Sequence, residues 1–351
     1  MKKLTLKNVL SLAAAAAICL SLAACSGGSG NAATPAPATP APGSAAPGSA
    51  APAGDGYRIA IVQQLDHASL DEIRKAVEAE LDAKAAELGI SITYKEFNGQ
   101  NDQSLLNQIG AQVASDGYDA VIPIASLAAQ CMVNATEELG TPIIYAAVSD
   151  PEIAGLTGID RVTGTSDALN TPFILDMMLA QNPALKSVGL LYSPSETNST
   201  TPIAEAKAYL DGKGIPYVEK TGTTADEIIA AAASLSGEVD AIFTPTDNSV
   251  MAVELTLAET FIEAGVPHYT GADSFVRNGA FTTCGVNYTE LGAYTADMAL
   301  DVLQTGSVPE FHVMDGGIIT VNTETAAALG IDYSVFSTMA STVSEVVTTE
   351  D

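Results

Sequence analysis

Two kinds of hydrophobic pattern alternate along the chain from Tyr57 onward. Short runs rich in β-branched residues predict buried strands, and longer runs with apolar residues three and four positions apart predict amphipathic helices. In the first half the predicted strands are residues 58–62, 90–94, 120–124 and 142–145. The predicted helices there are residues 70–88, residues 105–113 and a helix after Ser126. Because strands separated by helices form parallel βαβ units, this pattern predicts a doubly wound sheet.

The same alternation of predicted strands and helices continues in the second half of the chain. The predicted strands are residues 187–192, 216–218, 239–243 and 266–269, and the predicted helices are residues 173–179, 202–210, 225–235 and 249–264. The fold class is therefore α/β, with two doubly wound parallel-sheet lobes joined by a multi-strand hinge. We expect linking segments near residues 162–166, 285–288 and 304–312. Lobe one would comprise residues 57–163 and 288–304, lobe two residues 164–287 and 313–333, and residues 334–351 an acidic tail.

The first 56 residues have the composition of a secretion signal followed by a spacer. Three lysines precede an apolar run at residues 9–22, which is short for a membrane span and typical of a signal peptide. The run ends in Leu22-Ala23-Ala24-Cys25, which predicts cleavage after residue 24 and lipidation of Cys25. Alternatives are a plain signal peptide followed by a chance cysteine, or a signal-anchor helix. Residues 25–56, rich in Ala, Pro, Gly and Ser, predict a disordered spacer. We therefore expect a lipid-anchored protein on the extracytoplasmic face of the cell membrane.

Charge restricts the partners. Removing residues 1–24 removes three lysines and no acid, which leaves 11 basic against 42 acidic residues and a formal charge of about −31. Nucleic acid is then an improbable partner, and anionic lipid would repel the folded body, so only the lipid anchor would hold it at the membrane. We expect a monomer. Cys131 and Cys284 could pair in an oxidising compartment, but the predicted topology puts them in different lobes and favours two buried thiols.

Polar residues follow many of the predicted strands. Ligands bind outside the carboxyl ends of strands in open parallel sheets, so these positions form the predicted ligand site. The candidates are Gln64, His67, Ser126, Ser149, Asp150, Ser166, Glu196, Asn198, Thr246, Asp247, Asn248 and Asp273. Helix starts would favour a carboxylate and the acids an ammonium, which together suggest an amino acid, with Asp247 as the leading ammonium partner. Asp247, Asn248 and Ser126 could equally be helix caps, and Asp150 an ordinary turn residue.

Catalytic signatures are poor. The chain has three histidines and no GxSxG, HExxH or P-loop motif, so we expect neither an enzyme nor a metal site nor a cofactor.

Six stretches carry a resemblance to a known family. They are NGQNDQSLLNQI (98–109), the AAQ of ASLAAQ (125–130), AAVSDP (146–151), YSPSETNS (192–199), TPTDNSV (244–250) and NYTELG (287–292). With these stretches the chain resembles the tryptophan/tyrosine-type substrate-binding proteins of ABC importers.

The resemblance implies a type I periplasmic-binding-protein fold, and delivery of a small ligand to a separate permease and ATPase. Family ligands include aromatic amino acids. Leu127 and Cys284 depart from the family pattern and leave the ligand open. The chain has no tryptophan, so stacking would come from Tyr145, Tyr192, Phe275 or Tyr288. An extracellular sensing or adhesion module with the same fold is the alternative.

Lipidation is testable at one residue. In the Cys25→Ser variant we expect a protein that is released into the medium or left unprocessed, because the sulfur that accepts the lipid is gone. Membrane fractionation with metabolic lipid labelling measures this. A variant that stays membrane-bound and correctly cleaved would contradict the assignment.

Overall fold

The computed structural model describes residues 56–349. The predicted signal peptide (1–24), the lipidation site Cys25 and all of the spacer except Gly56 lie outside the described residues.

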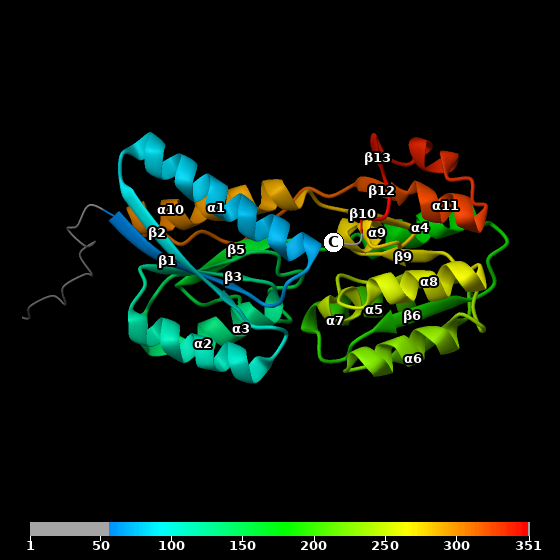
Figure 1. Cartoon of the computed structure of the whole chain (residues 1–351), viewed down its shortest axis with the longest axis horizontal. Helices are drawn as coiled ribbons and strands as arrows, with labels where there is room; N and C mark the ends of the chain where they lie inside the picture. Colours follow the sequence, from blue (N-terminus) through cyan, green and yellow to red (C-terminus); the bar gives the residue numbers. More distant parts are fainter. Residues whose placement is uncertain (1–55, 350–351) are drawn as a thin grey trace, which may run out of the picture. The chain divides into compact units, whose positions relative to one another are not determined.

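The first sheet has six parallel strands in the order β11-β5-β4-β3-β1-β2. They are β1 (Gly56–Gln63), β2 (Ser91–Asn98), β3 (Ala120–Ile124), β4 (Ile143–Tyr145), β5 (Val162–Ser166) and β11 (His312–Val313). The helices of this lobe are α1 (Ala68–Leu88), α2 (Gln103–Asp116), α3 (Ser126–Ala135), η1 (Glu137–Leu139) and α10 (Tyr288–Thr305). Helices α1 and α10 cover one face of the sheet, and α2 and α3 cover the other (Figure 1). The two faces bury separate hydrophobic clusters.

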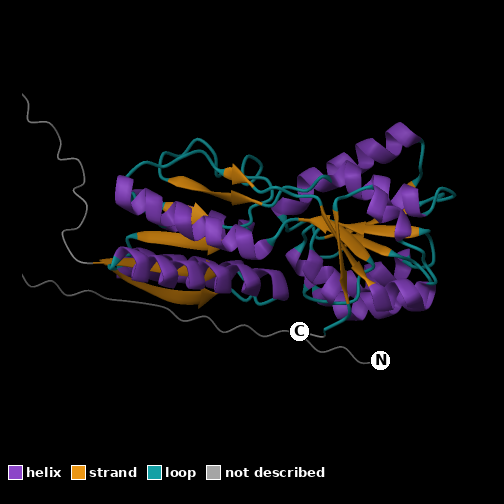
Figure 2. Cartoon of the chain, turned by 90° about the horizontal axis from the view of Figure 1, so that it is seen from above, coloured by secondary structure: helices purple, strands orange, loops and turns teal. Residues whose placement is uncertain are grey.

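The second sheet has seven strands in the order β13-β12-β10-β9-β8-β6-β7, parallel except where β12 runs antiparallel to β10. They are β6 (Val188–Tyr192), β7 (Tyr217–Thr221), β8 (Ala241–Thr244), β9 (His268–Thr270), β10 (Thr282–Gly285), β12 (Ile318–Asn322) and β13 (Thr342–Val346). The helices are α4 (Thr171–Gln181), η2 (Thr197–Ser199), α5 (Thr200–Lys213), α6 (Ala225–Leu235), α7 (Asn248–Met251), α8 (Glu254–Ala264), α9 (Asp273–Arg277), α11 (Thr323–Leu329) and η3 (Ser334–Thr338). Helices lie on both sides of the strands in the turned view (Figure 2). The predicted α/β class with two doubly wound lobes is confirmed.

Two predicted elements are wrong in detail. The single helix expected over residues 249–264 is two helices, because the chain turns at Ala252 and Val253. That turn places Glu254 in the core, where its carboxylate lies 2.9 Å from His268 Nδ1. The acidic tail expected from residue 334 includes β13, which pairs in parallel with β12. The side chains of β13 are mostly exposed, so they show little of the hydrophobic pattern that marks a buried strand.

Three segments cross between the sheets. Residues 162–166, expected as a link, form β5 of the first sheet, so the first crossing begins at Asp167. The second crossing follows β10, and the third surrounds β11. The third crossing is bonded to the strand that leads into the first crossing, because β11 pairs with β5 and Met314 N–H donates to Ser166 O at 2.9 Å. His312 in the third crossing also stacks on Tyr294 of α10, with 4.3 Å between ring centroids.

Among the described residues, no helix is both long and apolar enough to span a bilayer.

The close crossing of α1 and α10 depends on Gly292. A Cβ there would lie 2.6 Å from Ile73 O and 2.7 Å from Ala76 Cβ. We expect Gly292→Ala to lower the free energy of unfolding by roughly 1–3 kcal/mol, because the two helices must move apart. Urea unfolding followed by circular dichroism measures the change.

The matched control is Gly212→Ala in α5, where no atom lies within 4 Å of the new methyl group. There the better helix propensity of alanine should raise the free energy of unfolding by up to about 1 kcal/mol. Equal effects of the two substitutions would contradict the packing argument.

Candidate functional site

A small cavity lies between the lobes, at the carboxyl ends of strands from both sheets. The first lobe contributes the loops after β1, β3, β4 and β5 and the start of α10, and the second contributes the loops after β6, β8 and β9. Its lining residues are His67, Ser69, Leu70, Ala125, Ser126, Ala147, Ser149, Asp167, Asn198, Thr246, Asp247, Asn248, Met251, Ala272, Ser274, Phe275 and Tyr288. The lining, which mixes apolar side chains with a few polar groups, is that of a small-molecule site.

Two lining residues have backbone conformations that alanine rarely adopts. Ala125 has φ 77° and ψ 162°, and Ala147 has φ 55°. Ala125 is the N-cap of α3, so its conformation sets how the first N–H groups of that helix meet the cavity. Strain of this kind costs free energy and persists where the surrounding structure over-determines the geometry, often at ligand sites.

Asp167 is a buried carboxylate in the cavity wall, directly after β5. Its Oδ1 accepts from Ser149 Oγ at 2.8 Å, and its Oδ2 accepts from Tyr288 Oη at 3.1 Å. Burial raises the pKa of Asp167, and the two hydrogen bonds oppose that rise. Each oxygen accepts from one side chain and keeps capacity for another donor.

Asp247 accepts more hydrogen bonds from the protein than Asp167 does. Its Oδ1 accepts from Val250 N at 3.0 Å, which makes it the N-cap of α7, and its Oδ2 accepts from Ser193 N and Ser199 Oγ, both at 2.7 Å. The side chain is fully buried, and burial raises the pKa of Asp247. Asp247 therefore joins three segments of the second lobe at the cavity wall.

Several polar atoms in this wall have no protein partner. They are His67 Nδ1, Ser69 Oγ, Asn198 Oδ1 and Ser274 Oγ, each buried. Unpaired buried polar atoms cost free energy, and native structures contain few of them. Four at one cavity favour a polar ligand that bonds to them.

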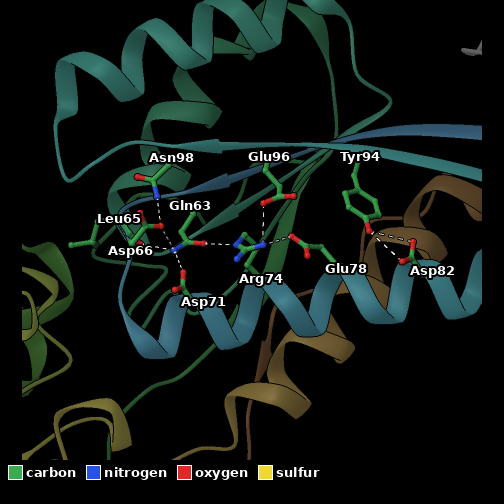
Figure 3. A network of polar contacts seen from close by, with 10 residues as sticks. All are labelled: Gln63, Leu65, Asp66, Asp71, Arg74, Glu78, Asp82, Tyr94, Glu96 and Asn98. Atoms are coloured by element: carbon green, nitrogen blue, oxygen red, sulfur yellow. Dashed lines mark hydrogen bonds and ion pairs between the residues drawn. The ribbon is translucent and has the colours of Figure 1, made fainter. Parts of the chain in front are cut away.

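The loop after β1 is held by the network in Figure 3. Gln63 Nε2 donates to Leu65 O and to Asp71 Oδ1, both at 2.7 Å, and Arg74 Nε donates to Gln63 Oε1 at 3.1 Å (Figure 3). Gln63 is buried, so this network orients the residues that follow it. Gln64 and His67, which reach the second lobe, are carried by that loop.

Side chains of the two lobes contact each other at several places around the cavity. Ser149 Oγ lies 3.0 Å from Thr246 Oγ1, and His67 Nε2 lies 3.0 Å from Asn248 Oδ1. Arg277 of α9 donates twice to Glu72 of α1, at 3.1 Å. The lobes are therefore closed over the cavity.

Seven of the twelve predicted site residues line this cavity: His67, Ser126, Ser149, Asn198, Thr246, Asp247 and Asn248. The other five lie nearby. Gln64 and Glu196 meet in the contact between the lobes, Asp150 and Ser166 line a separate hollow beside Phe311, and Asp273 begins α9 with Oδ2 3.4 Å from Arg277 Nη1.

Asp167, Ser69 and Ser274 line the cavity but were absent from the prediction. The prediction omits Asp167 because it treats residues 162–166 as a link between the lobes, although a polar residue soon after a strand is the feature that identifies the other candidates. Among the aromatic candidates, Phe275 and Tyr288 line the cavity. Tyr145 is buried in the first lobe, and Tyr192 Oη donates to Glu219 at 3.0 Å.

Cys131 and Cys284 are buried free thiols, which confirms that prediction. Within residues 56–349, no group of His, Cys, Asp and Glu side chains is arranged to hold a metal ion.

The chain is similar to known substrate-binding proteins over most of its length. The model of a family described as ABC transporter substrate binding protein matches residues 58–342. A tyrosine-binding protein of Clostridioides difficile is 32% identical over 278 residues, which cover 77% of this chain and 80% of that protein.

Two solved structures are also similar to this chain. An ABC domain in complex with L-Trp from Streptococcus pneumonia is 29% identical, with a TM-score of 0.76 over 82% of this chain and 99% of that one. A ligand-free, open substrate-binding protein with adhesive properties from Clostridium difficile is 31% identical, with a TM-score of 0.63 over 84% and 100%.

These likenesses agree with the two-lobed fold, the cavity between the lobes and the prediction that the protein is not an enzyme. The chain belongs to the family of ABC transporter substrate-binding proteins, whose members have the periplasmic-binding-protein fold.

Proposed function

We propose that this protein captures an aromatic L-amino acid, tyrosine or tryptophan, between its lobes and delivers it to the permease of an ABC importer. The observation that carries the proposal is the cavity between the lobes, whose lining combines a buried carboxylate, a helix start and an apolar wall. The tyrosine-binding relative and the relative in complex with L-Trp support the choice of ligand.

Asp167 would hold the ammonium group. Its two oxygens each keep room for a donor, whereas both oxygens of Asp247 already accept from groups that hold the second lobe together. An ammonium would supply the counter-charge that buried Asp167 lacks, and a charge-assisted hydrogen bond is stronger in an enclosed site than at a surface. Asp247, the leading candidate from the sequence, would instead shape the wall.

The start of α3 would hold the ligand carboxylate. Ser126 is the first residue of this ten-residue helix and is buried in the cavity wall. Leu127 N–H donates to Gln64 Oε1 at 3.2 Å, so Gln64 fixes the helix start from the side. Partial positive charge and unpaired N–H groups at a helix start favour a carboxylate.

The side chain of the ligand would lie against an apolar wall. Leu70, Met251, Ala272 and Phe275 line this part of the cavity, and Phe275 belongs to a hydrophobic cluster that continues into both lobes. An aromatic ring would cover these groups, whereas a short polar side chain would leave them without contacts.

Delivery requires opening and closing. The chain as a whole superposes better on the relative in complex with L-Trp than on the open, ligand-free one, with TM-scores of 0.76 and 0.63, which supports a closed arrangement. A ligand that bonds to both lobes favours the closed state, because it binds that state more tightly than the open one.

We further propose that the protein acts as a monomer, anchored through Cys25 on the outer face of the membrane. The cavity between the lobes favours capture of a small ligand over the adhesion alternative.

Ligand choice can be tested directly. We expect calorimetric titration with tyrosine, tryptophan, phenylalanine, leucine and a hexose to show binding of at least one of the first two, at higher affinity than leucine. Saturating ligand should add about 2.7 kcal/mol of stability at a hundred times Kd, seen as a higher Tm. Binding of the hexose alone would overturn the amino-acid proposal.

The ammonium partner can be tested with matched substitutions. Asp167→Asn should weaken binding of the same amino acid by about 2–5 kcal/mol, because the ammonium loses its counter-charge. Its effect on Tm without ligand should be small. Asp247→Asn should mainly lower Tm, since Asp247 accepts two backbone N–H groups.

Asp211→Asn on the exposed surface of α5 is the control for the charge change. Unchanged affinity in Asp167→Asn, together with a large loss in Asp247→Asn, would return the ammonium to Asp247.

A further inference from the structure

Glu196 lies at the contact between the lobes, outside the cavity. It precedes η2 in the second lobe and is 6% exposed. Its Oε1 accepts from Gln64 Nε2 at 3.3 Å and from Ser249 Oγ at 3.1 Å, and its Oε2 accepts from Asn248 Nδ2 at 3.0 Å. The carboxylate is therefore bonded to both lobes.

The groups around Glu196 extend this link. Asn101 of the first lobe accepts from Gln64 at 2.9 Å and donates to Ser249 at 3.2 Å. His67 of the first lobe lies 3.0 Å from the amide oxygen of Asn248. These contacts place Glu196 at the centre of the polar contact between the lobes on this side of the cavity.

This carboxylate has no cationic partner. Its three donors are neutral, and across residues 56–349 no lysine or arginine forms an ion pair with it. Asp247, a carboxylate of the same sign, acts electrostatically on Glu196 and raises its pKa further. An ionised carboxylate that closure takes out of water beside another acid costs free energy unless it binds a proton.

The other titratable group of the contact is His67, beyond Asn248. Asp66, Asp71 and Arg277 face this histidine, and burial lowers its pKa. Because an amide oxygen can only accept, His67 Nε2 carries the proton of a neutral imidazole and does not neutralise Glu196. Arg277 is engaged by Glu72 and Asp273.

We propose that closure of the lobes, and with it ligand binding, is coupled to the uptake of one proton by Glu196. The proton comes from solvent and returns to solvent when the lobes open. The proposal rests on the proposed function, since ligand binding is what favours closure.

The pH range in which Glu196 titrates supports proton uptake on closure. In the closed arrangement, burial and the nearby Asp247 raise the pKa of Glu196 to about 7. Once opening removes Gln64 and restores water, the pKa should return toward the ordinary value of about 4.3. The protonated carboxyl can keep its place in the network, because it can donate to Ser249 Oγ, and a hydroxyl accepts as well as donates.

The direction in which ligand affinity changes with pH follows from the direction of the pKa shift of Glu196. A group with a higher pKa in the closed state binds a proton on closure, so affinity rises as pH falls through about 7 and levels off near the open-state pKa. Binding should be roughly 10- to 30-fold weaker at pH about 8 than at about 5.5, with about half a proton taken up at pH 7. The ammonium and carboxylate of a free amino acid do not titrate in this range.

The test uses the full chain and L-tyrosine or L-tryptophan, whichever it binds. Calorimetry at several pH values, in pairs of buffers with different ionisation enthalpies, measures affinity and proton uptake together. Glu196→Gln imitates the protonated carboxyl, so it should lose most of the pH dependence and proton uptake. At pH about 8 it should bind the amino acid more tightly than the wild type, and a purely structural role would give weaker binding instead.

Glu205→Gln on exposed α5 is the matched control and should behave as the wild type. Coupling through His67 would have the opposite sign, because a pKa lowered by closure releases a proton. Equal proton uptake in the wild type and Glu196→Gln, or weaker binding of Glu196→Gln at every pH, would overturn the proposal. Failure of the wild type to bind either amino acid at any pH would instead overturn the proposed function.

Discussion

Both lobes present the carboxyl ends of parallel strands to a single region between them, and the site depends on this arrangement. In a parallel sheet those ends carry the loops that precede helices, so polar side chains and helix starts gather there. Because two sheets share one such region, residues from loops far apart in sequence, such as Ser149 and Thr246, come within hydrogen-bonding distance. The same closeness buries Asp167, Glu196 and Asp247 together, in a chain with a large excess of acids.

The closed state contains several local costs that a ligand or a proton can relieve. Ala125 and Ala147 hold strained backbone conformations, and His67, Ser69, Asn198 and Ser274 keep polar atoms without protein partners. Each cost is of the order of one to a few kcal/mol. Their concentration at one cavity implies that the closed state without ligand is less stable than its number of interlobe contacts suggests, which suits a protein that must reopen to release its ligand.

Much of the fold followed from the sequence because its signals are local. The strand β3 and the helix α1 show the hydrophobic pattern of buried elements, and Ser126 and Asp247 are predicted because they lie in loops that follow strands. Features that depend on distant contacts were missed. The helix breaks before Glu254, whose buried carboxylate pairs with His268 of strand β9. Strand β13 is defined by its backbone pairing with β12 rather than by buried side chains. Glu196 is one of the predicted site residues, but it lies outside the cavity, because its position depends on how the lobes meet.

The bonds between the third crossing and β5 have a mechanical consequence. Since β11 pairs with β5 and Met314 bonds to Ser166, the third crossing is fixed to the edge of the first sheet, beside the point where the first crossing leaves it. Two chain segments that leave one lobe side by side hinder twisting of the other lobe more than they hinder bending toward and away from it. Each opening and closing should then retrace the same arc and bring the same side chains back into register, without a search over relative orientations.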